Sequence, residues 1–311
     1  MCIFTQPVIS VNNTQIFARL SGTGTQLLAY QMKYESASDN AMILPLPVKQ
    51  PANENSLRFI DLKNYDLLFE DLDAGFPYHQ PPSGIGCSAT KDAVSADALN
   101  VFEVGNYIAS FVPSISDFER LDPQFTLPNE TWENIPNYEH FGFAVFQLAA
   151  GTLKPHPMAL EFQGKTDELF FPTVHIHDGE VHEHETFDHV LYLQHAGLDS
   201  RVHGYENSYV EDRSTGLIRS KFKAAQFCSA QKSKGLVLEQ LLVHRKSLRG
   251  KLPNTDTIIA LAGDPLKPSF NFRPWLQHAP WLIVVAAIGW FFNRRSKLRV
   301  NANRADEENT T

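Results

Sequence analysis

Short runs of apolar or alternating residues dominate the first fifty positions of the chain. They lie at Cys2–Val8, Gln15–Leu20, Gln26–Tyr34 and Ala41–Val48, and clusters of Asn, Gly and Ser separate them. Such runs, bounded by turn-forming residues, are typical of β-strands. The pattern therefore predicts a series of consecutive strands at the start of the chain.

A second block of strand-like runs begins at Phe141 and ends at Gln194. Between the two blocks, a leucine stripe predicts a short helix at Tyr65–Leu72. Helical spacing returns only later, at Ser220–Lys232 and Leu236–Arg249. The second of these runs ends in basic residues followed by Gly250, which is typical of a helix C-terminus.

Strands in runs followed by helices favour an α+β fold. We expect mostly antiparallel strands in residues 1–195 and helices in residues 218–250. One main α+β domain would cover residues 1–267, and the alternative is two β-rich halves, 1–112 and 140–267. The length of 311 residues is compatible with either arrangement.

A hydrophobic segment lies near the end of the sequence. Trp281–Phe292 carries no charged side chain, and basic residues follow it directly. As a helix this run spans about 18 Å, which is shorter than the hydrocarbon core of a bilayer, and extension back to Trp275 takes in Pro280. We expect a C-terminal hydrophobic helix over residues 274–293 that anchors the protein to a membrane through Trp275–Phe292. The alternative is an ordinary buried helix. The polar tail, residues 294–311, is expected to be disordered.

Charge and cysteine content narrow the function classes. Lys and Arg number 27 against 35 Asp and Glu, which gives a net charge of −8, so we expect no nucleic-acid partner. Three scattered cysteines cannot form a disulfide framework or a thiolate zinc site. The N-terminus has no basic region before an apolar run and is not a signal peptide, so we expect a cytoplasmic main domain.

The histidines concentrate around one Asp-Gly pair. Asp178-Gly179 lies between alternating residues, and this dipeptide is a strong signal for a two-residue hairpin turn. In that register the same face of the hairpin carries five polar side chains: His175, His177, Glu180, His182 and His184. The opposite face carries Val174, Ile176 and Val181, which would pack on the core.

Imidazoles on facing strands are close enough to share a metal ion. The sequence therefore predicts a metal site at His175, His177, Glu180, His182 and His184, with a divalent transition metal such as zinc as its cofactor. Two alternatives are a solvated polar face and a cluster that senses pH. The helical metalloprotease motif is absent, because Thr186 stands where its second histidine would be.

Cys2 is the candidate nucleophile. Removal of the initiator Met would give Cys2 a free α-amino group, which is the general base of N-terminal nucleophile hydrolases. The chain looks like the cysteine amidases of that group in having Cys2 on a first strand and Arg19 on the next. It departs from their pattern after Arg19, where Leu20, Ser21 and Gly22 replace the expected Asp. The alternative is that Cys2 is a small buried apolar residue.

Three motifs, MCIF at the start, ILPLPV and FPTVHIHDG…FDHVLYLQ, together resemble an uncharacterised family of bacterial proteins over most of residues 1–260. This resemblance implies a shared fold and carries no site. Three functions remain from the sequence: a metal-binding or structural domain with a membrane anchor, a cysteine amidohydrolase using Cys2, and a non-catalytic interaction protein tethered to a membrane.

Overall fold

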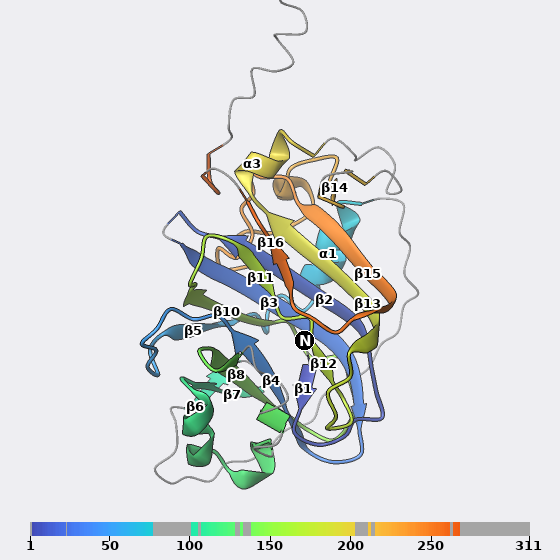
Figure 1. The fold of residues 1–311 in the computed structure, drawn as a ribbon. Coiled ribbons are helices and arrows are strands. Elements are labelled where there is room, and N and C mark those ends of the chain that lie inside the picture. The colour runs from blue at the N-terminus through green and yellow to red at the C-terminus, as the bar shows by residue number, and fades with distance from the viewer. Residues whose placement is uncertain are drawn as a thin grey trace, which may run out of the picture. The chain divides into compact units, whose positions relative to one another are not determined.

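The computed structural model describes residues 2–22, 24–76, 101–104, 107–127, 131–132, 138–202, 211–212, 215–261 and 264–267. One compact unit covers Met1–Ser269. Two large β-sheets form most of it (Figure 1).

The first sheet, sheet A, has six strands in the order β12-β1-β4-β8-β7-β6. Strand β1 lies between β12, with which it pairs in parallel, and β4, and the other pairings in this sheet are antiparallel. The N-terminal strand is thus held inside the sheet. The bounds are β1 Cys2–Phe4, β4 Asn40–Leu46, β6 Val101–Val104, β7 Tyr107–Val112, β8 Gly142–Leu148 and β12 His175–Ile176.

The second sheet, sheet B, has the order β14-β15-β13-β2-β3-β10-β5, and β9 adds to one end of β3. Strands β2 and β13 pair in parallel, and their neighbours are antiparallel. The bounds are β2 Ser10–Leu20, β3 Thr25–Ser36, β5 Leu57–Asp61, β9 Gly151–Leu153, β10 Met158–Gln163, β13 His184–Gln194, β14 Ile218–Arg219 and β15 His244–Pro253.

A third, two-stranded sheet and a few short helices complete the described fold. Strands β11 (Leu169–Phe171) and β16 (Thr257–Ile259) pair with each other. The helices are α1 (Leu68–Ala74) and α3 (Ala196–Asp199), with 3-10 turns η1 (Ile115–Arg120), η2 (Pro123–Phe125) and η4 (Ala224–Gln226). All of these helices are short, so strand pairing determines the architecture.

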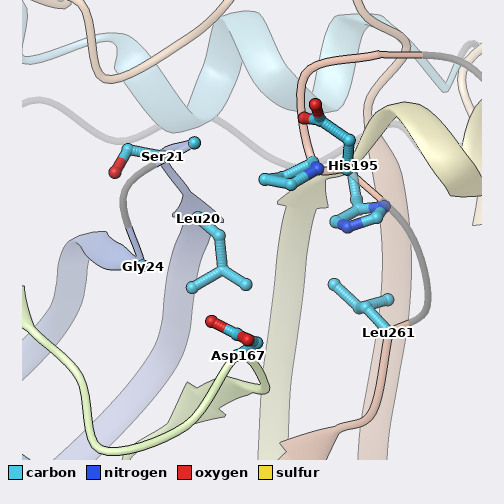
Figure 2. A pocket seen from close by; sticks show the side chains of 9 residues that line it. Leu20, Ser21, Gly24, Asp167, His195 and Leu261 are labelled. Atoms are coloured by element: carbon cyan, nitrogen blue, oxygen red, sulfur yellow. The ribbon is translucent and has the colours of Figure 1, made fainter.

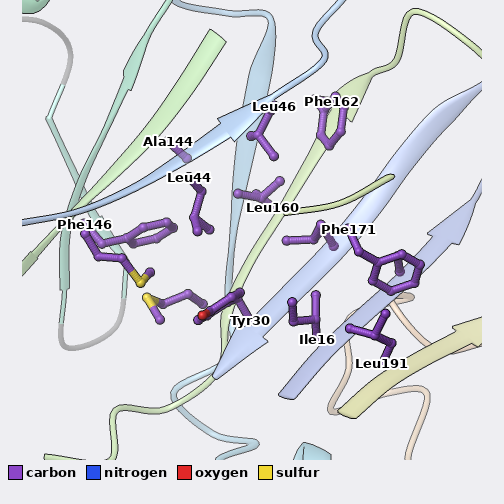
Figure 3. Close-up of a cluster of buried hydrophobic side chains, with 14 of the residues drawn as sticks. Ile16, Tyr30, Leu44, Leu46, Ala144, Phe146, Leu160, Phe162, Phe171 and Leu191 are labelled. Atoms are coloured by element: carbon purple, nitrogen blue, oxygen red, sulfur yellow. The ribbon is translucent and has the colours of Figure 1, made fainter. Parts of the chain in front are cut away.

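The main core contains side chains from both large sheets. Leu44 and Phe146 come from sheet A, and Tyr30 and Leu160 from sheet B, and all four belong to one buried cluster (Figure 3). The opposite face of sheet B is covered by α1 and the segment around Leu236. Phe118 and Trp132 cover the opposite face of sheet A. Both sheets are therefore buried on two faces, which explains why β4 has no exposed residue.

The predicted α+β fold class is wrong, because the described chain is mostly β and holds only short helices. The two helices expected in residues 218–250 are not formed. The first contains only the turn η4, and the second gives way to β15 from His244 onward. Strand β13 offers β15 ten paired residues, and Arg245, expected at a helix end, is instead buried beside Asp73. Non-local pairing has overridden local helical spacing here.

The expected C-terminal hydrophobic helix falls on residues that the structure does not describe. Residues 274–293 and the tail 294–311 lie outside the described residues. Within the described part of the chain, no helix is long and apolar enough to cross a membrane.

Candidate functional site

The chain bends at Asp178-Gly179, but the predicted two-residue hairpin turn does not form. Gly179 has a φ of 89°, and the Asp178 carboxylate accepts the backbone N–H of Glu180 at 3.0 Å. The strands on either side then enter different sheets: β12 pairs with β1 in sheet A, and β13 pairs with β2 and β15 in sheet B. The bend at Asp178-Gly179 therefore connects two sheets, and the five predicted side chains do not share a face.

Of the two histidines before this bend, His175 is buried and His177 is partly buried, and the buried His189 joins them. The Nε2 atoms of His175 and His189 are 3.0 Å apart, and the rings of His175 and His177 stack with their centres 4.8 Å apart. Phe187 and Phe4 border this cluster, with ring centres 4.6 Å from His175 and 5.8 Å from His177. We call His175, His177 and His189 the buried histidine cluster.

Burial keeps these three imidazoles neutral. It lowers the pKa of His175 to about 2 and that of His177 to about 4, and it lowers the pKa of His189 further still. The positive charge at the chain's N-terminus lowers all three further. Among the described residues, His175 Nδ1, His177 Nε2 and His189 Nδ1 have no hydrogen-bond partner. The cluster therefore carries a polar cost inside the core.

The other three predicted ligands are exposed. Glu180, His182 and His184 point to solvent, and His182 Nε2 lies 3.0 Å from the Asp178 carboxylate, which raises the pKa of His182. Within the described residues, no group of three or more His, Cys, Asp or Glu side chains is placed to hold a metal ion. The predicted metal site is wrong, because its residues are divided between the core and the surface.

Cys2 lies at the start of β1, in register with His175 of β12. Only its backbone is described, so its predicted role as a nucleophile stays a prediction. Cys228 is buried, and burial raises the pKa of its thiol to about 12. Cys228 is therefore a protonated thiol at neutral pH.

A pocket of about 300 Å³ opens at the far end of β13, where His195 follows the strand (Figure 2). Its walls come from the turn after β2, from Asp167 before β11, and from the segment after β16. The lining residues are Leu20, Ser21, Gly22, Gly24, Asp167, His195, Leu261, Asp264 and Pro265.

Sequence reasoning missed this pocket. It is assembled from four separate stretches of the chain, and no motif joins them. Many histidines follow His175, and they indicated that this part of the chain is unusual. The residues predicted as metal ligands, however, do not line the pocket. The sequence analysis names neither His189 nor His195 as a site residue, yet His189 completes the buried histidine cluster and His195 lines the pocket.

Comparison with known protein families finds no match for this sequence. Among solved structures, the chain is similar to the crystal structure of baculovirus P35, at 15% identity and a TM-score of 0.44, over 82% of this chain and 97% of that one. It is similar to a mutated baculovirus P35 after caspase cleavage, at 14% identity and a TM-score of 0.43, over 80% and 99%. The caspase-8/P35 complex matches at 12% identity and a TM-score of 0.44, over 82% and 97%.

These similarities combine low identity with partial overlap of the backbones, and they assign no function to this chain.

Proposed function

We propose that this chain is a non-catalytic interaction protein that binds an extended acidic segment of a partner protein. The segment would add to sheet B as a further strand beside β15. The observation that carries the proposal is the unequal pairing of the two sides of β15.

On one side, β13 pairs with β15 from His244 to Pro253 without a break in register. On the other side, β14 pairs only with His244 and Arg245. Among the described residues, no strand pairs with Lys246–Pro253 on that side. A strand edge of this kind presents unpaired N–H and C=O groups, which are the groups used when a peptide adds to a sheet.

The charge of the unpaired edge of β15 favours a partner segment of opposite charge. Lys246, Arg249 and Lys251 lie on β15, and the strand contains no acidic residue. Arg249 and Lys251 are exposed, while Asp188 opposite Arg249 offsets part of the charge. Basic residues on an edge disfavour pairing with neutral or basic strands, and they attract an acidic one. In a chain of net charge −8, this basic strand is complementary to acidic peptides.

The burial of the histidines supports a non-catalytic role. His175 and His189 are the closest pair of titratable groups in the cluster, but they are 4% and 0% exposed. General acid–base catalysis requires such groups to reach the substrate. His175 and His189 are therefore out of reach of a dissolved substrate.

A binding experiment with a defined peptide tests the proposal. The probe is a fluorescent peptide of alternating Glu and Val, and its partner probe has the same sequence with alternate backbone nitrogens methylated. We expect saturable binding of the first peptide and a loss of at least about tenfold in affinity for the second, since methylation removes the donors needed for strand pairing.

Charge-reversal variants provide the matched control. The double variant Arg249→Glu/Lys251→Glu should weaken binding by about tenfold or more, whereas Lys221→Glu/Lys223→Glu, which changes two exposed basic residues elsewhere, should change it less than about twofold. Equal affinities for the methylated and unmethylated peptides would overturn strand addition. Equal effects of the two double variants would overturn the assignment to β15.

A further inference from the structure

The pocket beside His195 combines one buried hydrogen-bond donor with two carboxylates. His195 is 1% exposed, and its Nδ1 accepts the backbone N–H of Gly197 at 3.1 Å. A neutral imidazole that accepts at Nδ1 carries its proton on Nε2. This Nε2–H has no hydrogen-bond partner among the described residues, and the ring lines the pocket next to Leu261 and across from Leu20 (Figure 2).

His195 remains neutral under ordinary conditions. Burial lowers its pKa, and the nearby His244 lowers it further, while Asp199 and Asp264 act in the opposite direction. The imidazole therefore presents a hydrogen-bond donor without a positive charge. Such a group favours an acceptor oxygen on a ligand, such as a hydroxyl or carbonyl oxygen.

The carboxylates give the pocket a negative charge. Asp167 makes no ion pair with any described residue, and a β-carbon built on Gly24 would lie 3.6 Å from its Oδ1. The carboxylate of Asp264 accepts the backbone N–H of Leu266 at 2.9 Å and lies 3.7 Å from the exposed Lys267 amine. Asp167 is therefore the stronger candidate to pair with a ligand cation, and Asp264 adds to the negative potential.

The remaining surfaces limit the size and the shape of a ligand. The pocket volume of about 300 Å³ lies at the lower end of the range for small-molecule sites. Leu20, Leu261 and Pro265 supply apolar contacts. Gly24 has a φ of 76°, and it has no side chain that would cover the Asp167 carboxylate.

We infer that this pocket binds a small organic cation that also carries a hydroxyl oxygen, such as an amino sugar or an amino alcohol. The ammonium group would pair with Asp167, a hydroxyl oxygen would accept the Nε2–H of His195, and the carbon frame would pack on Leu20 and Leu261. The site is separate from the β15 edge, because it shares no residue with that strand.

Titration with matched sugars tests this inference. Glucosamine carries an ammonium group, and N-acetylglucosamine has the same ring without the charge. We expect glucosamine to shift the amide resonances of Gly22, Gly24 and His195 in a saturable manner, and we expect N-acetylglucosamine to bind at least about tenfold more weakly. Ethanolamine serves as a smaller probe with the same two groups.

Two neighbouring substitutions separate the pocket from general electrostatics. Asp167→Asn and Glu168→Gln each remove one negative charge, but only Asp167 lines the pocket. Asp167 is exposed, so its substitution leaves the core intact. Asp167→Asn should weaken glucosamine binding by about tenfold, and Glu168→Gln by less than about twofold. The inference is overturned if neither glucosamine nor ethanolamine binds, if the two sugars bind equally, or if the two variants behave alike.

Discussion

The Nε2 atoms of His175 and His189 face each other at 3.0 Å between the two large sheets. Only one of the two neutral rings can donate its proton to this contact. The other ring then carries its proton on Nδ1, where no described residue accepts it. In either arrangement, one buried N–H is unpaired, and such a group costs about 1–3 kcal/mol.

A double-mutant cycle measures this pair. His189→Leu removes the partner of His175 and leaves both nitrogens of that ring unpaired, so we expect the free energy of unfolding to fall by about 2 kcal/mol. The double variant His175→Leu/His189→Leu replaces both polar groups with apolar side chains and should recover most of that loss. Urea denaturation of the four proteins gives the values, and additive losses in the double variant would contradict this account.

Mild acid should destabilise the protein. Because the pKa values of His175, His177 and His189 are lowered in the folded state, the unfolded chain binds protons first as the pH falls below about 6.5. The charge at the N-terminus works in the same direction for all three, and Asp178 opposes it at His177. Three neutral imidazoles then cost about 4 kcal/mol of stability per pH unit below that point.

Denaturation between pH 8 and pH 5 measures the effect. The slope of stability against pH near pH 5.5 should be smaller by about two protons in His175→Leu/His189→Leu than in the wild type, where the buried His195 and His244 add their own contribution. The exposed His140→Gln provides the control and should retain the wild-type slope. A stability that stays constant from pH 7 to pH 5 would show that the cluster is not the neutral group described above.

Local sequence patterns located individual strands better than they located partners. Alternation places β3 and β4 within a few residues, since both are long and rich in apolar side chains. The Asp178-Gly179 dipeptide also marks a place where the chain bends, with a positive φ at Gly179. Its strands separate because β1 pairs with β12, and β2 and β15 flank β13, and these are choices between distant segments. The spacing of apolar residues within a short segment does not show which distant segment that strand will pair with.

The candidate sites show the same contrast between local sequence patterns and long-range contacts. The sequence identified His175 and His177 as unusual, and their rings do stack, but His175 is buried and His177 partly buried instead of lying on a solvated polar face. His189 follows in the next strand at a spacing that no motif marks. The pocket at His195 depends on Asp167 and on residues after β16, and only the folded sheets bring these together.

Asp73 anchors a buried cation on the α1 side of sheet B. Its Oδ1 accepts Arg245 Nη1 at 3.0 Å and the Tyr192 hydroxyl at 3.1 Å, and the Arg245 guanidinium lies 4.4 Å from the ring centre of Phe76. Asp73→Ala should lower the free energy of unfolding by about 3–5 kcal/mol, because Arg245 is 3% exposed and would lose its counter-charge.

Combined and control substitutions identify the cause. The double variant Asp73→Ala/Arg245→Met removes both charges and should recover much of the loss, whereas Asp66→Ala, at an exposed acidic residue nearby in sequence, should change stability by less than about 0.5 kcal/mol. Chemical denaturation supplies all three values. If Asp73→Ala is as mild as Asp66→Ala, the ion pair contributes nothing to the fold.

Gly142, at the start of β8, is fixed by the ring that packs against it. A β-carbon built at this position would lie 2.5 Å from Cζ of Phe111, which is 1% exposed, and 3.3 Å from Cγ2 of Val48. Gly142→Ala should therefore lower the free energy of unfolding by about 1–3 kcal/mol through overpacking.

Gly164→Ala is the matched control, because the atom nearest to its added β-carbon would be 3.4 Å away. Adding Phe111→Leu to Gly142→Ala frees the space that the methyl group needs, so the double variant should be more stable than the sum of the two single losses predicts. Strict additivity in urea denaturation would place the need for glycine elsewhere than at this ring.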